Sequence, residues 1–100
     1  MSDPTNYSLV VPAGYNYQNI TTSAQTQVKV GGGWLGGVVL NTTLVSAVRL
    51  YDNTVSGTPI IATIPALATA GNFYKYEARL NTGLVVSSGA AADNITVLYL

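Results

Sequence analysis

The stretch Phe73-Tyr74-Lys75-Tyr76-Glu77-Ala78-Arg79-Leu80 decides the fold class. Charged side chains occupy every second position from residue 75, and the positions between them are aromatic or apolar. Successive residues of a strand point to opposite faces of a sheet, so this period of two predicts a strand with one charged, wet face and one buried face. Asn81-Thr82-Gly83 then predicts a tight hairpin turn, and Leu84-Val85-Val86-Ser87 predicts the strand that pairs back.

Other strand-forming stretches occur along most of the chain, separated by Gly, Pro, Asn and Asp, which favour turns. The further predicted strands are Gln25–Val30, Trp34–Asn41, Leu44–Tyr51, Thr58–Ile64 and Ile95–Leu100, with Tyr7–Val11 as a short candidate. The alanine-rich segment 66–70 is long enough for one helical turn at most. Segment 15–19 is polar and aromatic, and we expect it to form an ordered arm or loop.

Alternation within these stretches also predicts which side chains are buried. Val48 and Leu50 are assigned to the core, because Arg49 between them should face water. Val28 and Val30 are expected to share one face of their strand.

The composition favours the same architecture. Val, Ile and Thr total 29 residues and suit a pleated, half-buried surface, whereas Glu, Lys, Arg and Gln total eight, too few to cover a surface helix. Short strands about 9 to 15 residues apart, with no helix between them, are typical of an antiparallel sandwich or barrel. We therefore expect an all-β protein, an antiparallel β-sandwich of jelly-roll or Ig-like type with about seven or eight strands. Residues 1–22 should form an N-terminal arm and residues 23–100 the sandwich domain.

The charge content excludes several functional classes. Charged residues make up 8% of the chain, the formal net charge is zero, and there is no Cys, no His and one Glu. A disulfide scaffold, a Cys/His zinc site and catalysis by Cys or His all need residues that are missing. A nucleic-acid binder guided by electrostatics needs an excess of basic residues. We expect no catalytic residue, no cofactor, no metal and no nucleic-acid partner.

Weaker motifs have structural explanations that we favour. Gly31, Gly33 and Gly36 fit the spacing of a dinucleotide-binding motif, but a strand-like run follows them where that motif needs a helix, so a bulge or a close backbone approach is favoured. Asp52 and Asp93 each precede an Asn and are interpreted as turn residues rather than as a calcium site or an acid/base pair.

Two further patterns are interpreted in the same way. The row of charged residues Lys75, Glu77 and Arg79 is interpreted as a solvated face, or as charges that prevent aggregation at an edge strand. The alternative is a contact between subunits. The four Asn-x-Ser/Thr sequons are attributed to composition, because the chain is rich in Asn and Thr.

Aromatic residues are the best candidates for contact with a partner. Trp34 lies among glycines, where it either fills a core or anchors a partner or a sugar ring. Tyr7, Tyr15 and Tyr17 lie in the predicted arm, which has little core of its own to cover them. These four residues are the predicted partner contacts.

Hydropathy predicts neither a membrane span nor a secretory signal. The uncharged stretch 53–74 contains two prolines and several polar residues, so it is not a run of about 20 apolar residues. The first residues have no basic start followed by an apolar segment. We expect the product to stay, at first, in the cytoplasm of the cell that makes it.

A pattern of strand and turn residues is carried by the segments 36–41, 48–52, 60–65, 76–84 and 94–99. This pattern resembles that of small virion proteins of tailed bacteriophages, in particular capsid decoration or cement proteins and head-fibre components with β-sandwich folds. The resemblance covers residues 33–100, about two thirds of the chain, and leaves residues 1–22 outside it.

The resemblance implies a non-enzymatic structural protein that binds the outside of a bacteriophage capsid and decorates or cements it. The implied partner is the major capsid protein, the implied state is a homo-oligomer with a trimer favoured, and the implied location is the capsid surface, after synthesis in the host cytoplasm. Two alternatives stay open. One is a tail, fibre or adaptor component of the same particle, and the other is a carbohydrate-binding β-sandwich that uses Trp34 and exposed tyrosines.

Overall fold

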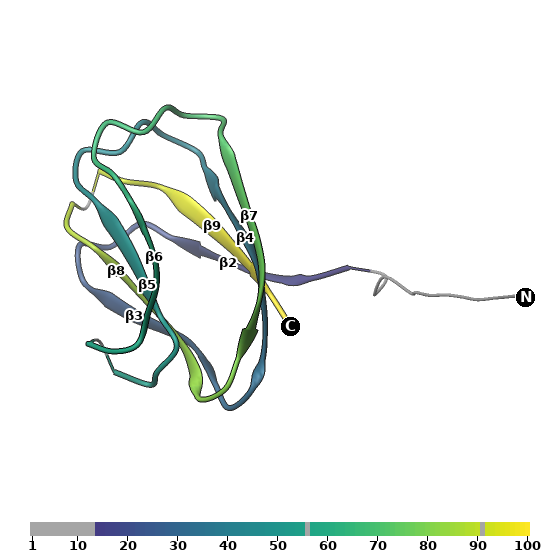
Figure 1. The fold of residues 1–100 in the computed structure, drawn as a ribbon. Coiled ribbons are helices and arrows are strands. Elements are labelled where there is room, and N and C mark those ends of the chain that lie inside the picture. Colours follow the sequence, from purple (N-terminus) through teal and green to yellow (C-terminus); the bar gives the residue numbers. More distant parts are fainter. Residues whose placement is uncertain (1–13, 56, 91) are drawn as a thin grey trace, which may run out of the picture.

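Strands pack face to face in two antiparallel sheets of four in the computed structural model of the chain, which describes residues 14–55, 57–90 and 92–100 (Figure 1). The strands are β2 (Asn16–Ile20), β3 (Gln25–Val30), β4 (Gly33–Leu40), β5 (Val48–Tyr51), β6 (Ile60–Ile64), β7 (Phe73–Leu80), β8 (Gly83–Ser88) and β9 (Ile95–Tyr99). The described residues contain no helix. The predicted all-β sandwich is confirmed.

Strand order identifies the sandwich as a jelly roll. The first sheet has the order β2-β9-β4-β7 and the second sheet has the order β3-β8-β5-β6. The antiparallel pairs β2–β9, β3–β8, β4–β7 and β5–β6 are nested one inside the next, as in one long hairpin whose tip joins β5 to β6. Rolling that hairpin adds the pairs β4–β9 and β5–β8, which complete the two sheets.

This order separates the two sandwich types that the sequence left open. In an Ig-like sandwich several consecutive strands pair within one sheet. Here only β5 and β6 are both consecutive along the chain and neighbours in a sheet, so every other described connection passes from one sheet to the other (Figure 1). The jelly-roll alternative is therefore the one observed.

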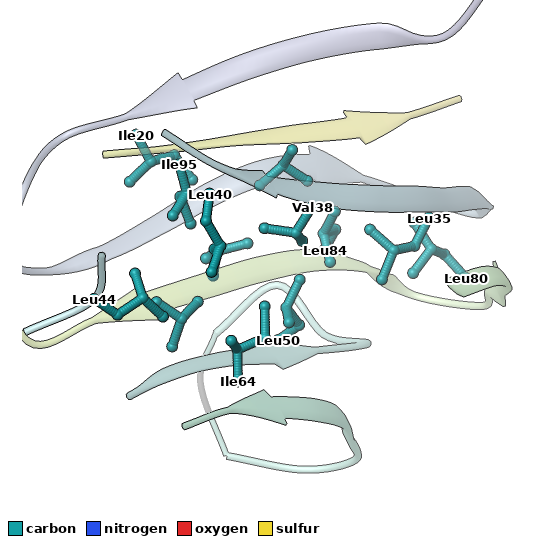
Figure 2. Close-up of a cluster of buried hydrophobic side chains, with 13 residues drawn as sticks. Ile20, Leu35, Val38, Leu40, Leu44, Leu50, Ile64, Leu80, Leu84 and Ile95 are labelled. Carbon is teal, nitrogen blue, oxygen red and sulfur yellow. The ribbon is translucent and has the colours of Figure 1, made fainter. Parts of the chain in front are cut away.

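The core fills the space between the sheets and consists of aliphatic side chains from both (Figure 2). Its members are Ile20, Leu35, Val38, Leu40, Leu44, Val48, Leu50, Ile64, Leu80, Leu84, Val86, Ile95 and Val97. Tyr74, Tyr76 and Ala78 of β7 pack against this cluster, while the charged residues between them are exposed. The alternation that predicted β7 thus also predicted its buried face, and the assignment of Val48 and Leu50 to the core is confirmed.

The N-terminal boundary predicted from the sequence is wrong. Segment 15–19, expected in an arm or loop, contributes to β2, which pairs with β9 at the edge of the first sheet, so the sandwich begins before residue 23. β2 lies at the edge of the sheet and buries only the side chain of Ile20 fully. Because few of its positions need an apolar residue, its sequence shows almost no alternation of apolar and polar residues. The predicted strand Tyr7–Val11 lies outside the described residues.

Three smaller expectations are also corrected. The strand predicted to start at Leu44 starts at Val48, because the two backbone N–H groups after Leu44 bind a carboxylate instead of a neighbouring strand. Segment 66–70 forms a turn closed by the Ala68 N–H and the Pro65 carbonyl, not a helical turn. Val30 is exposed, since a bulge in β3 between Gln27 and Lys29 shifts its register.

The core predicts a contrast between two leucines. Replacing Leu50, which has no exposed surface, with Ala should lower the free energy of unfolding by about 2–5 kcal/mol, because a cavity is left between the sheets. The matched change Leu67→Ala removes the same atoms from a side chain that is 76% exposed and should cost no more than about 0.5 kcal/mol. Urea unfolding of both variants measures the difference, and similar losses would contradict the packing described.

Candidate functional site

Asp52 follows β5 and its carboxylate is buried at one end of the sandwich. It accepts hydrogen bonds from the backbone N–H groups of Asn81 (2.9 and 3.1 Å), Thr82 (2.8 Å) and Gly83 (3.2 Å). These three residues form the tight turn between β7 and β8. One side chain therefore satisfies the polar backbone of a turn about 30 residues away, and holds that turn against the end of β5. The turn does not close the hairpin predicted from the sequence, because β7 pairs with β4 in the first sheet, whereas β8 pairs with β3 and β5 in the second.

Two opposing effects determine the ionisation of this carboxyl. Burial raises the pKa of Asp52, but the hydrogen bonds from the turn backbone and from the Asn81 side chain together lower it more. The resulting pKa lies below the ordinary value of 3.8. Asp52 is thus an ionised structural anion at neutral pH, and a general acid would need the opposite shift.

Asp93, just before β9, does the same at the opposite end. Its buried carboxylate accepts hydrogen bonds from the backbone N–H groups of Val45 (2.6 Å) and Ser46 (3.4 Å), in the segment that leads into β5. The sequence predicted that both aspartates lie in turns or loops, which is confirmed. It missed that their carboxylates are buried and bind backbone 29 to 48 residues away.

The remaining motifs have structural roles. A strand, β4, begins at Gly33, where a dinucleotide-binding motif would need a helix. A Cβ at Gly33 would overlap the carbonyl oxygen of Leu100, so the predicted close backbone approach is confirmed. Lys75 and Glu77 form an exposed ion pair (3.5 Å) on β7, which is an edge strand as the charge row indicated. No group of three or more acidic, Cys or His residues that could hold a metal ion occurs in the described parts of the chain.

Two cross-strand rows show what the outer face of the first sheet carries. One row runs Tyr17–Leu98–Gly37–Lys75 across β2, β9, β4 and β7. The next row runs Asn19–Thr96–Val39–Phe73 across the same strands. Apart from the edge strand β7, these rows hold no charge.

Aromatic rings lie over the glycines in the middle of this face. A Cβ at Gly36 would lie 2.8 Å from the Tyr15 ring, and one at Gly37 would lie 2.6 Å from the Phe73 ring. The two glycines therefore leave room for rings that approach the β4 backbone from both sides. Here we define the aromatic face as Tyr15, Tyr17, Trp34, Val39 and Phe73.

The structure brings three of the predicted contact residues together on this face. Tyr17 is 72% exposed and Trp34 is 48% exposed, so Trp34 is not a core residue, and Tyr15 is half-buried against Gly36. Tyr7 lies outside the described residues. The sequence missed Phe73, which is 50% exposed, although its position in the alternation placed it on the same face as the β7 charges.

A network of amides closes one end of the aromatic face. The Asn94 side-chain oxygen accepts hydrogen bonds from the Asn19 amide (2.7 Å) and the Asn41 amide (3.0 Å), and the Asn41 amide also donates to the Thr96 hydroxyl (3.0 Å). These bonds join β2, β9 and the residue after β4. The asparagines belong to three of the sequons, and their amides are engaged in the fold.

The outer face of the second sheet is different. Val85 of β8, which points away from the core cluster, is fully buried, and its neighbour Gln27 donates a hydrogen bond to the Thr54 carbonyl (3.0 Å). Arg49 and Thr63 are exposed beside each other on β5 and β6. This face mixes polar residues with the exposed aliphatic side chains of Val30 and Ile60. The exposed aromatic residues Tyr17, Trp34 and Phe73 all lie on the first sheet, which makes that sheet the candidate site for binding.

The fold and site define a jelly-roll β-sandwich with a neutral, aromatic outer face. Comparison of the chain with protein-family models, with curated proteins and with solved structures found no match. None of the described residues forms a helix long and apolar enough to cross a membrane. The resemblance to phage virion proteins therefore stays a prediction.

The pKa of Asp52 leads to a prediction with a definite sign. Because its folded pKa is lowered, Asp52 contributes stability in full above about pH 3.8, and this contribution is lost as the pH falls through the folded pKa. Asp52→Asn should lower the free energy of unfolding at pH 7 by about 1.5–3 kcal/mol, since the hydrogen bonds lose their charge. Below pH 3.8 the difference in free energy of unfolding between Asp52→Asn and the wild type should become smaller, because the wild-type carboxylate becomes protonated.

Urea unfolding between pH 2.5 and 7 measures both quantities. Glu77→Gln is the matched control, because it removes a carboxylate that is exposed, and should cost less than about 1 kcal/mol. An Asp52→Asn protein as stable as the wild type at pH 7, or a gap independent of pH, would refute the role given to Asp52.

Proposed function

We propose that this chain is a non-enzymatic structural protein of a bacteriophage virion that binds the outside of the capsid and decorates or cements it. The aromatic face is the surface that makes the contact. The observation that carries the proposal is that the exposed aromatic rings are concentrated on one sheet of the sandwich. The two buried carboxylates, Asp52 and Asp93, bind backbone N–H groups of loops and turns. The resemblance in segments 36–99 supplies the particular class.

The composition of the face suits a permanent contact between proteins. Tyr, Trp and Phe are enriched at interfaces because each buries a large area at a low entropic cost. Charges are absent from its central strands, so docking would not require the removal of water from unpaired ions. Such a contact would also be insensitive to ionic strength.

The partner in this proposal is the major capsid protein, and the chain acts as a homo-oligomer, with a trimer favoured. A formal net charge of zero removes the electrostatic repulsion that keeps small proteins apart. Exposed aromatic side chains such as Tyr17 and Phe73 gain most when a second surface covers them.

Binding to shells tests the proposal. Shells of the encoding phage, assembled without this chain, should bind the purified protein in a sedimentation assay. The double variant Tyr17→Ser/Phe73→Ser should bind at least about tenfold more weakly, because it removes the two most exposed rings of the aromatic face.

The matched control is Ile60→Ser, which removes an apolar side chain that is also 50% exposed but lies on the second sheet. It should bind as the wild type does. Binding to tails but not to shells would support the tail or fibre alternative. A monomeric protein that binds neither would exclude the virion role.

A further inference from the structure

A small depression lies at the end of the aromatic face opposite the amide network. It has a volume of about 340 Å³ and is lined by Gly32, Gly33, Trp34, Arg79, Leu80 and Asn81. That volume is at the low end of the range for small-molecule sites, so it suits a single compact unit and not an extended ligand. The lining comes from the start of β4 and the residue before it, and from the end of β7 and the residue after it. Two of these residues are glycines, which have no side chain.

Trp34 and Arg79 stand side by side in this depression as a cross-strand pair of β4 and β7. The indole of Trp34 is 48% exposed although Trp34 lies in a central strand whose next residue is fully buried. The Trp34 backbone is fixed by two hydrogen bonds with Leu100, each 2.9 Å long. The result is a rigid aromatic platform beside a cation.

No described residue forms an ion pair that neutralises the charge of Arg79. Glu77, the acid nearest to it on the same strand face, is paired with Lys75, and Arg79 makes no ion pair with any described residue. Asp52 lies beneath the adjacent turn but is buried and bound to backbone N–H groups.

The turn that carries Asn81 is also held in place. Its backbone N–H donates to both carboxylate oxygens of Asp52, so the distance between Asn81 and Arg79 is set by a buried anchor. Preformed polar groups around a stacking surface are the arrangement that lowers the entropic cost of binding a small ligand.

We propose that this depression binds a saccharide unit that bears a carboxylate. The apolar face of the sugar ring lies on the indole of Trp34, as aromatic side chains bind flat, amphipathic partners. The Arg79 guanidinium binds the carboxylate through two parallel hydrogen bonds, a geometry that Arg matches and Lys does not. Asn81 lies at the rim, where the sugar hydroxyls are. This site does not depend on the capsid role proposed above.

The single Trp of the chain makes the site directly measurable, because all tryptophan emission comes from Trp34. Titration with trigalacturonate and with N-acetylneuraminate should change that emission in a saturable way. Maltotriose, a neutral sugar, and acetate, a carboxylate without a ring, are the comparison probes. Both should bind at least about tenfold more weakly, because each lacks one of the two interactions.

Variants assign the interaction to residues. Arg79→Gln should weaken trigalacturonate binding about tenfold or more. Trp34→Ala should weaken it by a similar factor, and its binding is measured by calorimetry, because this variant has no tryptophan emission. Arg49→Gln is the matched control, because it removes the same charge from the outer face of the second sheet, and it should leave binding unchanged.

Four results would overturn the site: no response to either acidic sugar at 10 mM, equal binding of maltotriose, equal binding of acetate, or equal weakening by Arg49→Gln. Unfolding of Arg79→Gln by urea confirms that the fold is retained. Because Tyr17→Ser/Phe73→Ser leaves the depression intact, loss of shell binding with retained sugar binding separates this site from the capsid contact.

Discussion

The carboxylate of Asp52 joins the end of β5 in the second sheet to the turn that leads from β7 in the first sheet to β8 in the second, and the connection between the sheets at this end depends on that contact. Nested pairing brings these segments together although about 30 residues separate them. A buried anion that accepts three backbone N–H bonds is stabilised only in this geometry. It therefore fixes where β7 ends, and with it the positions of Arg79 and Asn81. Asp93 performs the same task at the other end.

How far the sequence predicts this structure depends on how each element is buried. β7 is half buried along its whole length, so its period of two could be seen at once, and the turn at 81–83 followed from it. The predicted pairing of β7 with β8 was wrong, because a turn signal does not show whether the next strand stays in the same sheet or crosses to the other. β2 escaped prediction because it buries only Ile20 fully. The roles of Asp52 and Asp93 could not be predicted, because their partners lie 29 to 48 residues away and only the nested topology brings them close. The one available signal was their rarity, since three Asp and one Glu are the only acids.

The candidate site followed the same division. Aromatic side chains without an obvious core identified Tyr15, Tyr17 and Trp34, and the structure places them on one sheet face. The rings of Tyr15 and Phe73 lie against Gly36 and Gly37. Those contacts join segments that are distant in sequence, so the sequence alone could not predict them. The two buried acids of the sandwich, Asp52 and Asp93, hold loops. The surface therefore offers for binding the exposed rings of the first sheet and the Arg79 guanidinium beside Trp34.

The central claim is the proposed place of this chain on the outside of a phage head, and a reconstruction of the particles made by the encoding phage, at side-chain resolution, tests it most directly. The account predicts that the chain lies on the outside of the head, with the aromatic face against protein and the outer face of the second sheet toward solvent. A chain absent from the head, or one that contacts the shell through β3, β8, β5 and β6 while Tyr17 and Phe73 face solvent, would contradict it.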